Sequence, residues 1–319
     1  MRSALVTGAN GFLGRALCRK LQARGVHVRA LLRTECSGPW QESVSADLTD
    51  TAIPAGIMEG IDTVFHLAGK AHALSERLGD AADEYQAVNV EGTSSLLKHA
   101  EQAAVHRFLY YSSIKAQGGG AHCQVDETDT TPPDTPYGVS KLRAEVLVRA
   151  ATAIPHRVIL RPTMVYGPGS KGNLPRMIRF IQRGLFPPWP QIRNRRSMVH
   201  VDDLIEATLL AATHPDARAE TYIVADHDAY STRELYVWIR EALGKPIPSW
   251  SLPLPILNLA ATIGDGFGAV LGRRFPFDSD TLNKLVADAL YDGSKMRTQL
   301  GFTPKHTLRA ALPEIIQSM

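Results

Sequence analysis

Short apolar runs alternate with segments of helical periodicity through the first half of the chain. The apolar runs predict strands over residues 4–8, 26–33, 62–69, 107–113 and 157–162. Between them, apolar positions recur at helical spacing and predict a helix from Leu13 to Gly25, followed by helices over 85–104 and 137–151. Because helical crossovers join parallel strands, this alternation predicts an α/β fold of Rossmann type, a doubly wound parallel sheet with helices on both faces.

The pattern changes after about Pro168, where prolines and loops become denser. A capping-box pattern, in which Glu234 follows Ser231 by three residues, predicts the start of a helix. We therefore expect a dinucleotide-binding domain over residues 1–168 and a smaller substrate-binding lobe over 169–319, with some elements of the second half returning to the main domain.

One apolar stretch, residues 252–272, has to be weighed as a membrane span. Pro253, Pro255 and Asp265 interrupt it, which disfavours a spanning helix. We expect instead a helix that is buried or covers the substrate.

Composition narrows the class of protein and its compartment. Apolar residues make up 44% of the chain and charged residues 21%, and the net charge of +3 is too small to indicate a nucleic-acid partner. Cys18, Cys36 and Cys123 have neither paired nor metal-binding spacing, so we expect no metal site and a reducing compartment. The first predicted strand starts too close to Met1 for a signal peptide, and we expect a cytoplasmic protein.

A glycine-rich turn follows the first predicted strand and opens the first predicted helix. Its glycines let backbone approach a pyrophosphate, and the helix N-terminus supplies N–H donors. A structural turn is the simpler alternative, but the βα context favours a dinucleotide site. We expect the cofactor to contact the residues of this turn, namely Gly8, Asn10, Gly11, Phe12, Leu13 and Gly14.

The choice between NAD and NADP depends on the end of the second strand. An acidic residue there would hold the ribose 2′-hydroxyl of NAD. Arg33 stands at that point instead, and an arginine suits the 2′-phosphate of NADP, although a solvated surface arginine is the alternative. Asp47 follows the third strand, where we expect it to contact adenine.

A set of polar residues predicts alcohol–ketone chemistry. Ser112 and Ser113 end a strand at the carboxyl edge of the sheet, where open α/β sheets bind ligands. Tyr137 and Lys141 are four residues apart and share one helix face. We expect the Lys141 ammonium to favour the Tyr137 phenolate and to hold the cofactor ribose, while Ser113 binds the reacting oxygen.

The chain resembles the extended short-chain dehydrogenase/reductases, and within them the NAD-dependent epimerase/dehydratase group. The resemblance rests on the motifs TGANGFLG, HLAG, NVEGT, SSIK, YGVSK, RPTMVYGPG and HVDDL, in the family's order. It implies catalytic roles for Ser113, Tyr137 and Lys141, a preference for NAD, and a homodimer packed through the helices over 85–104 and 137–151. Further cofactor contacts are implied for Leu48, Leu67, Ala68, Gly69, Asn89 and Pro162.

The resemblance also bears on the substrate. Asn173 and Arg196 match positions that contact UDP in nucleotide-sugar members, and Lys284 is the nearest basic candidate for a second, unmatched arginine. Ile114 and Lys115 follow Ser113 where sugar dehydratases carry an Asp-Glu pair, which disfavours water elimination. Lys115 either faces the substrate or lies in solvent. The motifs look most like those of UDP-glucose or UDP-N-acetylhexosamine 4-epimerases and 4-ketoreductases.

Two alternatives stay open at this point. The stretch over 252–272 and the second strand also resemble 3β-hydroxysteroid-type dehydrogenases, which reduce or oxidise an apolar substrate. A non-catalytic dinucleotide-sensing module is the other alternative, although such proteins usually lose the Tyr/Lys pair that Tyr137 and Lys141 retain.

Overall fold

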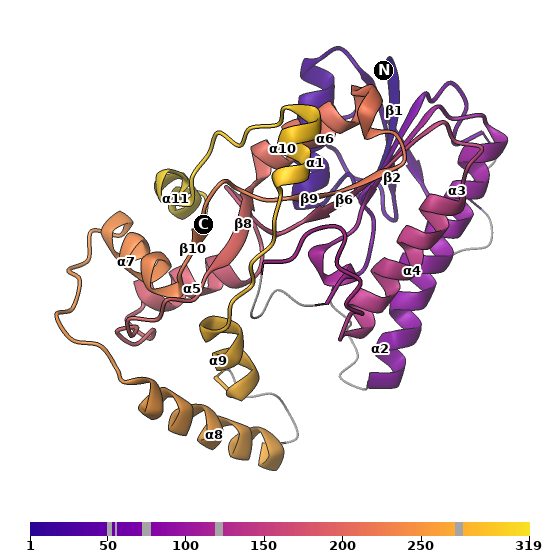
Figure 1. The fold of residues 1–319 in the computed structure, drawn as a ribbon. Helices are drawn as coiled ribbons and strands as arrows, with labels where there is room; N and C mark the ends of the chain where they lie inside the picture. Colours follow the sequence, from indigo (N-terminus) through magenta and orange to yellow (C-terminus); the bar gives the residue numbers. More distant parts are fainter. Residues whose placement is uncertain (50–52, 55, 72–77, 119–123, 272–276) are drawn as a thin grey trace.

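The main sheet has seven parallel strands in the order β3-β2-β1-β4-β5-β6-β9 (Figure 1). The computed structural model describes residues 1–49, 53–54, 56–71, 78–118, 124–271 and 277–319. The sheet order confirms the predicted doubly wound fold. Its strands are β1 (Ser3–Thr7), β2 (His27–Leu32), β3 (Glu42–Ser45), β4 (Thr63–His66), β5 (Arg107–Tyr111), β6 (His156–Pro162) and β9 (Glu220–Val224).

Helices cover both faces of this sheet, and each face has its own apolar core. Leu17 of α1 (Phe12–Ala23), Leu204 of α6 (Val201–Thr213) and Met296 of α10 (Ser294–Leu300) belong to one core. Leu96 of α3 (Gly92–Gln102) and Ala144 of α4 (Pro136–Ala150) belong to the other. The strand order reverses between β1 and β4, so the crevice for a ligand is expected at the carboxyl ends of these strands.

The prediction of one continuous helix over 85–104 is wrong, because the structure divides this region into three segments. The structure has α2 (Leu78–Tyr85), a π-helical segment (Gln86–Glu91) and then α3. The π-helical segment places the Asn89 side chain, whose Nδ2 donates to Lys70 O at 3.0 Å and whose Oδ1 accepts from Lys70 N at 2.7 Å. Because π-bulges often occur at functional sites, this departure from a regular helix coincides with a predicted cofactor residue.

The second lobe is built around a small sheet in the order β10-β8-β7. Its core includes the buried side chains of Trp189, Tyr236 and Leu312. The predicted capping box is present, because Ser231 Oγ accepts from Glu234 N and Ser231 N donates to Glu234 Oε2. The elements of this lobe are β7 (Met164–Tyr166), α5 (Asn173–Gln182), β8 (Arg196–His200), β10 (Ala229–Tyr230), α7 (Thr232–Ala242), α8 (Leu254–Leu271), α9 (Ser279–Val286) and α11 (Leu308–Gln317).

Elements from the second half return to the main domain: β9 pairs with β6, and α6 and α10 pack on the sheet. The boundary at residue 168 stays a prediction. Within the apolar stretch over 252–272 the structure has α8, which is buried on one side only, since Leu257 is 2% and Leu259 62% exposed. The alternative expectation, that this helix covers the substrate, stays a prediction. Within the described ranges, every helix is too short or too polar to cross a membrane. Cys123 and Gly272 lie outside the described residues.

Candidate active site

The glycine turn has the shape that a dinucleotide site requires. Gly8 has φ +66°, a left-handed conformation that favours glycine, and a Cβ there would lie 2.9 Å from Ala68 N. A Cβ on Gly14 would lie 2.1 Å from Gly8 O, so α1 packs directly onto the turn. Gly11 caps α1 without a side-chain hydrogen bond, and the first turn carries no acidic residue. The helix N-terminus therefore fits an anionic pyrophosphate.

Buried hydrogen bonds join the turn to the neighbouring strand and helix. His66 Nδ1 lies 2.7 Å from Thr7 Oγ1, and His66 Nε2 lies 2.9 Å from Thr93 Oγ1. Burial, reinforced by the Lys141 charge, lowers the pKa of His66 to about 3, so its ring is neutral. Thr7 Oγ1 also accepts from Ala68 N at 3.0 Å, which fixes the chain after β4 against the turn.

The predicted cofactor residues after β4 come together with those of the helices. A Cβ on Gly69 would lie 3.1 Å from Asn89 Oδ1 and 3.6 Å from Lys141 Nζ. Asn89 Nδ2 donates to Ser140 Oγ at 2.9 Å, which joins the π-helical segment to α4. Of the remaining predicted residues, Leu48 and Pro162 are buried, Phe12, Leu13 and Leu67 are half-buried, and Asn10 is exposed.

Basic side chains surround the predicted adenine end of the site. Arg33 follows β2 and is exposed, and its charge helps to lower the pKa of Asp47, whose main stabilisation is a hydrogen bond from Thr49 N. Arg15, which the sequence analysis missed, donates to Ser37 O at 3.2 Å and lies over the Trp40 ring. The sequence could have indicated Arg15, because it directly follows Gly14 in the first turn of α1.

Ser113 and Tyr137 meet because a glycine lets two backbone segments come close. Ser113 caps a short 3₁₀ helix (Ile114–Ala116) that follows β5. A Cβ on Gly138 would lie 2.1 Å from Lys115 O, so only glycine allows this 3₁₀ helix to pack on the start of α4. The Ser113 side chain therefore lies close enough to the Tyr137 phenol to lower its pKa. Gly138 was missed from sequence, although it stands inside the quoted motif.

The electrostatics of Tyr137 differ from the expectation. Burial raises the pKa of Tyr137, a hydrogen bond with Ser113 opposes the increase, and Tyr85 adds to it. The Lys141 ammonium is held elsewhere: its Nζ donates to Tyr111 O at 2.6 Å and lies over the Tyr110 ring. Burial lowers the pKa of Lys141 to about 7. Tyr137 is therefore a protonated phenol at neutral pH in this arrangement.

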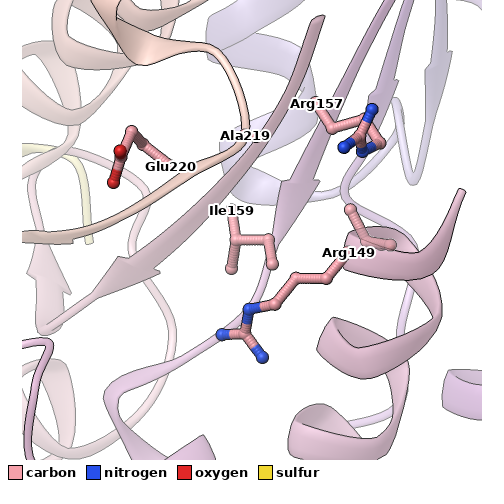
Figure 2. Close-up of a pocket in the computed structure, with 6 residues that line it drawn as sticks. Arg149, Arg157, Ile159, Ala219 and Glu220 are labelled. Carbon is pink, nitrogen blue, oxygen red and sulfur yellow. The ribbon is translucent and has the colours of Figure 1, made fainter. Parts of the chain in front are cut away.

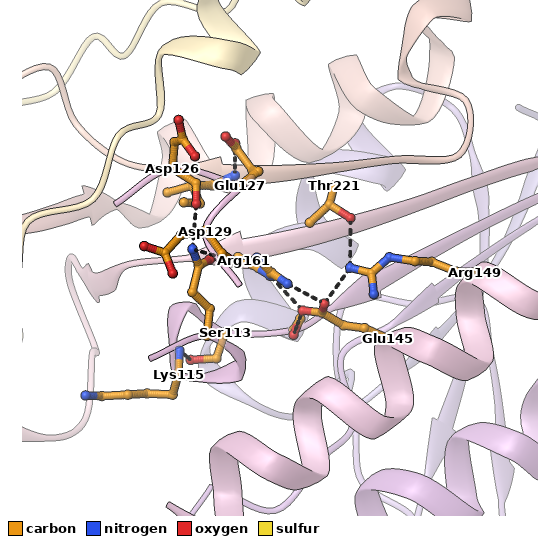
Figure 3. A network of polar contacts seen from close by, with 12 residues as sticks. Ser113, Lys115, Asp126, Glu127, Asp129, Glu145, Arg149, Arg161 and Thr221 are labelled. Carbon is orange, nitrogen blue, oxygen red and sulfur yellow. Dashed lines mark hydrogen bonds and ion pairs between the residues drawn. The ribbon is translucent and has the colours of Figure 1, made fainter. Parts of the chain in front are cut away.

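A buried ion-pair network lies one helical turn beyond Lys141 (Figure 3). Glu145 is fully buried and receives Arg161 Nε at 2.9 Å and Arg161 Nη2 at 2.7 Å, a bidentate pair. Ser112 Oγ donates to the same carboxylate at 2.5 Å. Arg161 Nη1 donates to Gln117 Oε1 at 2.6 Å. The network joins β5, α4 and β6, the elements that carry the candidate catalytic residues, and was not recognised from sequence.

The structure brings two of the four predicted substrate residues together. Arg196 Nη1 donates to the carbonyl oxygens of Lys284 and Ala287, so Arg196 lies against the C-terminal end of α9. The Lys284 side chain is exposed and pairs with Asp280. Asn173 is exposed at the start of α5, and Lys115 is exposed beside Ser113. The Arg196 side chain therefore contacts the backbone carbonyl of Lys284.

A surface pocket elsewhere on the sheet is separate from this site (Figure 2). It lies at the amino-terminal ends of β6 and β9, opposite the carboxyl edge that holds the candidate catalytic residues. Its lining residues are Val148, Arg149, Arg157, Ile159, Ala219 and Glu220.

Comparisons with known proteins agree with this picture. The fold and glycine turn define a Rossmann-type, dinucleotide-dependent enzyme. The model of the NAD dependent epimerase/dehydratase family matches residues 4–225. The chain belongs to that family, and the resemblance noted from its motifs is confirmed.

Three curated relatives extend over nearly the whole chain. A UDP-glucose 4-epimerase of Vibrio cholerae is 30% identical, covering 99% of this chain and 95% of the relative. A 3β-hydroxysteroid dehydrogenase/Δ5→4-isomerase of Mycobacterium tuberculosis is 31% identical, covering 98% and 89%. An N-acetyl-α-D-glucosaminyl-diphospho-ditrans,octacis-undecaprenol 4-epimerase of Escherichia coli O157:H7 is 26% identical, covering 99% and 94%.

Among solved structures, MoeE5 in complex with UDP-glucuronic acid and NAD is 27% identical. The two chains superpose with a TM-score of 0.76, covering 99% of this chain and 98% of MoeE5. The similarity includes the C-terminal lobe as well as the Rossmann domain.

Proposed function

We propose that this chain is an NAD-dependent 4-epimerase of a sugar linked through a diphosphate, with UDP-glucose and UDP-N-acetylhexosamine as the first candidate substrates. The observation that carries the proposal is the approach of Ser113 to Tyr137 at the carboxyl edge of the sheet, with Lys141 one turn further along the same helix. Two relatives with epimerase names and the UDP-sugar complex of MoeE5 support it. Their substrates share a sugar diphosphate.

Residues of the glycine turn are proposed to hold the pyrophosphate of the cofactor. Gly8, Gly11 and Gly14 let the backbone approach it, and the N-terminus of α1 faces it with N–H donors. Bound NAD supplies the hydride acceptor and donor. We propose NAD on the strength of the family, whereas Arg33 and Arg15 favour NADP; Asp47 is proposed to contact adenine.

The chain's own residues are proposed to move the proton at the sugar C4 oxygen. Tyr137 Oη, with its raised pKa, holds a proton at neutral pH and can donate it to a 4-keto oxygen. The reverse step needs a Tyr137 phenolate, which the Lys141 ammonium would favour if it moved from Tyr111 O towards the phenol. Ser113 orients the same oxygen through its hydroxyl.

Arg196 is the better supported of the basic substrate candidates. Its guanidinium is held against α9, and such a fixed planar fork is suited to a diphosphate. Lys284 is paired with Asp280, which makes it a weaker candidate. We propose Asn173 and Lys115 as further contacts, since both are exposed near ends of elements that border the site.

A cytoplasmic homodimer is also proposed. The family packs through helices that correspond to α3 and α4, and Val146 on α4 is 56% exposed. Sedimentation velocity tests it: a monomer at micromolar concentration would exclude this assembly.

The activity is tested on purified protein without added cofactor. We would measure bound nicotinamide, then incubate the protein with UDP-GlcNAc or UDP-glucose and follow C4 epimers by NMR. Epimer formation supports the proposal, and Tyr137→Phe should abolish it while cofactor binding persists. A Tyr137→Phe variant that retains turnover would exclude the mechanism.

A steroid-type ketone reductase is the second candidate, and the exposed apolar helix α8 favours it. That function predicts net consumption of NADPH with an apolar ketone, no epimer, and no competition by UDP. The non-catalytic sensing module predicts tight cofactor binding without turnover of either substrate class.

A further inference from the structure

Exposed apolar side chains are concentrated in and before α8. Ile256, Leu259 and Ile263 are 50%, 62% and 52% exposed, and their spacing of three and four residues places them on one helix face. The opposite face holds Leu257 and Ala261, which are buried in the core of the C-terminal lobe. The helix is therefore anchored by one apolar face and presents a second apolar face outwards.

The outer face of α8 carries few charged side chains that would favour its exposure to water. Asp265 is the sole ionisable residue in Leu254–Leu271, and its carboxylate accepts from Ser279 N at 3.0 Å and Ser279 Oγ at 2.5 Å. Trp250, just before the helix, is 60% exposed. A contiguous exposed apolar face of this kind marks an interaction surface.

The position of α8 leaves its outer face accessible. Figure 1 shows α8 at the periphery of the C-terminal lobe, well away from the seven-stranded sheet. A helix that is held to its own lobe by one apolar face can place its other face at the boundary between headgroups and acyl chains of a bilayer, where the strength of binding increases with the apolar area that is buried. An exposed tryptophan at one end is typical of the same location.

Basic residues lie on the segment that packs beside the start of this helix. Leu252 N donates to Pro188 O at 2.9 Å, which joins the approach to α8 to residues 184–195. On that segment Arg193 and Arg195 are exposed. Exposed arginines on the segment that is joined to the approach to α8 complement the negative charge of anionic lipid headgroups.

We propose that Trp250 and the outer face of α8 dock this protein on the surface of a lipid bilayer, preferably one with anionic lipids. This docking is inferred from these surface properties, independently of the enzymatic activity. Only the reason for docking, given next, rests on the proposed function. If the sugar diphosphate is carried on a polyisoprenol, α8 brings the active site to the membrane that holds the substrate.

The test is co-flotation of the full chain with phosphatidylcholine vesicles, with and without phosphatidylglycerol. The wild-type protein should float with vesicles, more completely when phosphatidylglycerol is present. Ile263→Glu should lower the partition coefficient by about tenfold or more, because a carboxylate would enter the apolar interface. Met319→Glu is the matched control and should leave flotation unchanged, since Met319 is 51% exposed and follows α11, away from α8 in the sequence.

Separate readouts distinguish this proposal from the enzymatic one. Circular dichroism and turnover of a water-soluble UDP-sugar should be the same in Ile263→Glu as in the wild type. A wild-type protein that floats without epimerising any sugar would contradict the proposed function only. Wild-type protein that stays unbound with both vesicle types, or an Ile263→Glu variant that floats normally, would overturn the docking. Vesicle-independent dimers lost in Ile263→Glu would assign α8 to a second copy and also overturn it.

Discussion

Removing the Glu145 carboxylate should destabilise the Rossmann domain far more than removing any exposed ion pair. In Glu145→Ala, the Arg161 guanidinium, only 5% exposed, would lose both hydrogen bonds to its bidentate partner. Breaking one side of a buried pair leaves an uncompensated charge and costs about 3–5 kcal/mol. This is a large fraction of the roughly 5–15 kcal/mol by which domains are stable.

Arg149→Ala is the matched control because it removes a solvent-exposed ion-pair partner of the same Glu145 carboxylate. Arg149 Nη2 contacts Glu145 Oε2 at 2.8 Å, but its side chain is 43% exposed (Figure 3). Solvent screening limits such pairs to about 0–1 kcal/mol. The difference between the two variants therefore measures the consequence of burial, with the same acceptor in both.

Urea unfolding followed by tryptophan fluorescence and circular dichroism gives the free energies. The double variant Glu145→Ala/Arg161→Ala should cost less than the sum of the single variants by about 0.5–3 kcal/mol, since neither charge is then left alone. A Glu145→Ala variant within about 1 kcal/mol of Arg149→Ala, or strictly additive single variants, would refute the reasoning.

Three further outcomes follow from the site. Gly14→Ala should abolish cofactor binding in fluorescence titrations or unfold the domain, because its Cβ would lie 2.1 Å from Gly8 O; normal affinity would contradict the described turn. Arg33→Glu should lower the affinity ratio of NADP to NAD by about tenfold or more, and an unchanged ratio would make Arg33 a surface residue. Between about pH 7 and the ordinary Lys pKa of 10.5, unfolding takes up a proton at Lys141, so stability should rise with pH; Lys141→Met should flatten this part of the urea-midpoint profile.

The parts of the fold that could be predicted are those with local signals. The strands before Gly8 and Ser113 are short apolar runs, and the α7 start at Ser231 has its own capping residues. β9 gave no comparable signal, because its residues lie in the second half of the chain and join the sheet only through pairing with β6. Long-range pairing of this kind is set by tertiary contacts rather than by local pattern.

The candidate site shows the same division between local and long-range information. Tyr137 and Lys141 could be placed on one helix face from their spacing alone. The dinucleotide turn could likewise be predicted from its local sequence. The direction of the Tyr137 pKa shift could not be predicted, because it depends mainly on burial of the phenol and also on the neighbouring Ser113 and Tyr85 side chains. The burial of helix α8 could be predicted only in part for a related reason: an apolar sequence predicts burial, and the structure uses only one of its faces for that purpose.

Helix α4 carries Tyr137, Lys141 and Glu145 at successive four-residue steps, so chemistry and stability share one face. The adjacent serines at the end of β5 divide in the same way. Ser112 is 5% exposed and donates to Glu145, whereas Ser113 lies beside Tyr137 and lowers the pKa of its phenol.

This division predicts opposite phenotypes for neighbouring substitutions. Ser112→Ala should lower the free energy of unfolding by about 1.5–3 kcal/mol, the worth of a hydrogen bond to a charged group, with kcat nearly unchanged. Ser113→Ala should leave stability within about 0.5 kcal/mol and lower kcat by about a hundredfold or more. Urea unfolding and single-turnover kinetics measure the two effects. If Ser112→Ala and Ser113→Ala changed the free energy of unfolding equally and also changed kcat equally, the division of roles between the two serines would be wrong.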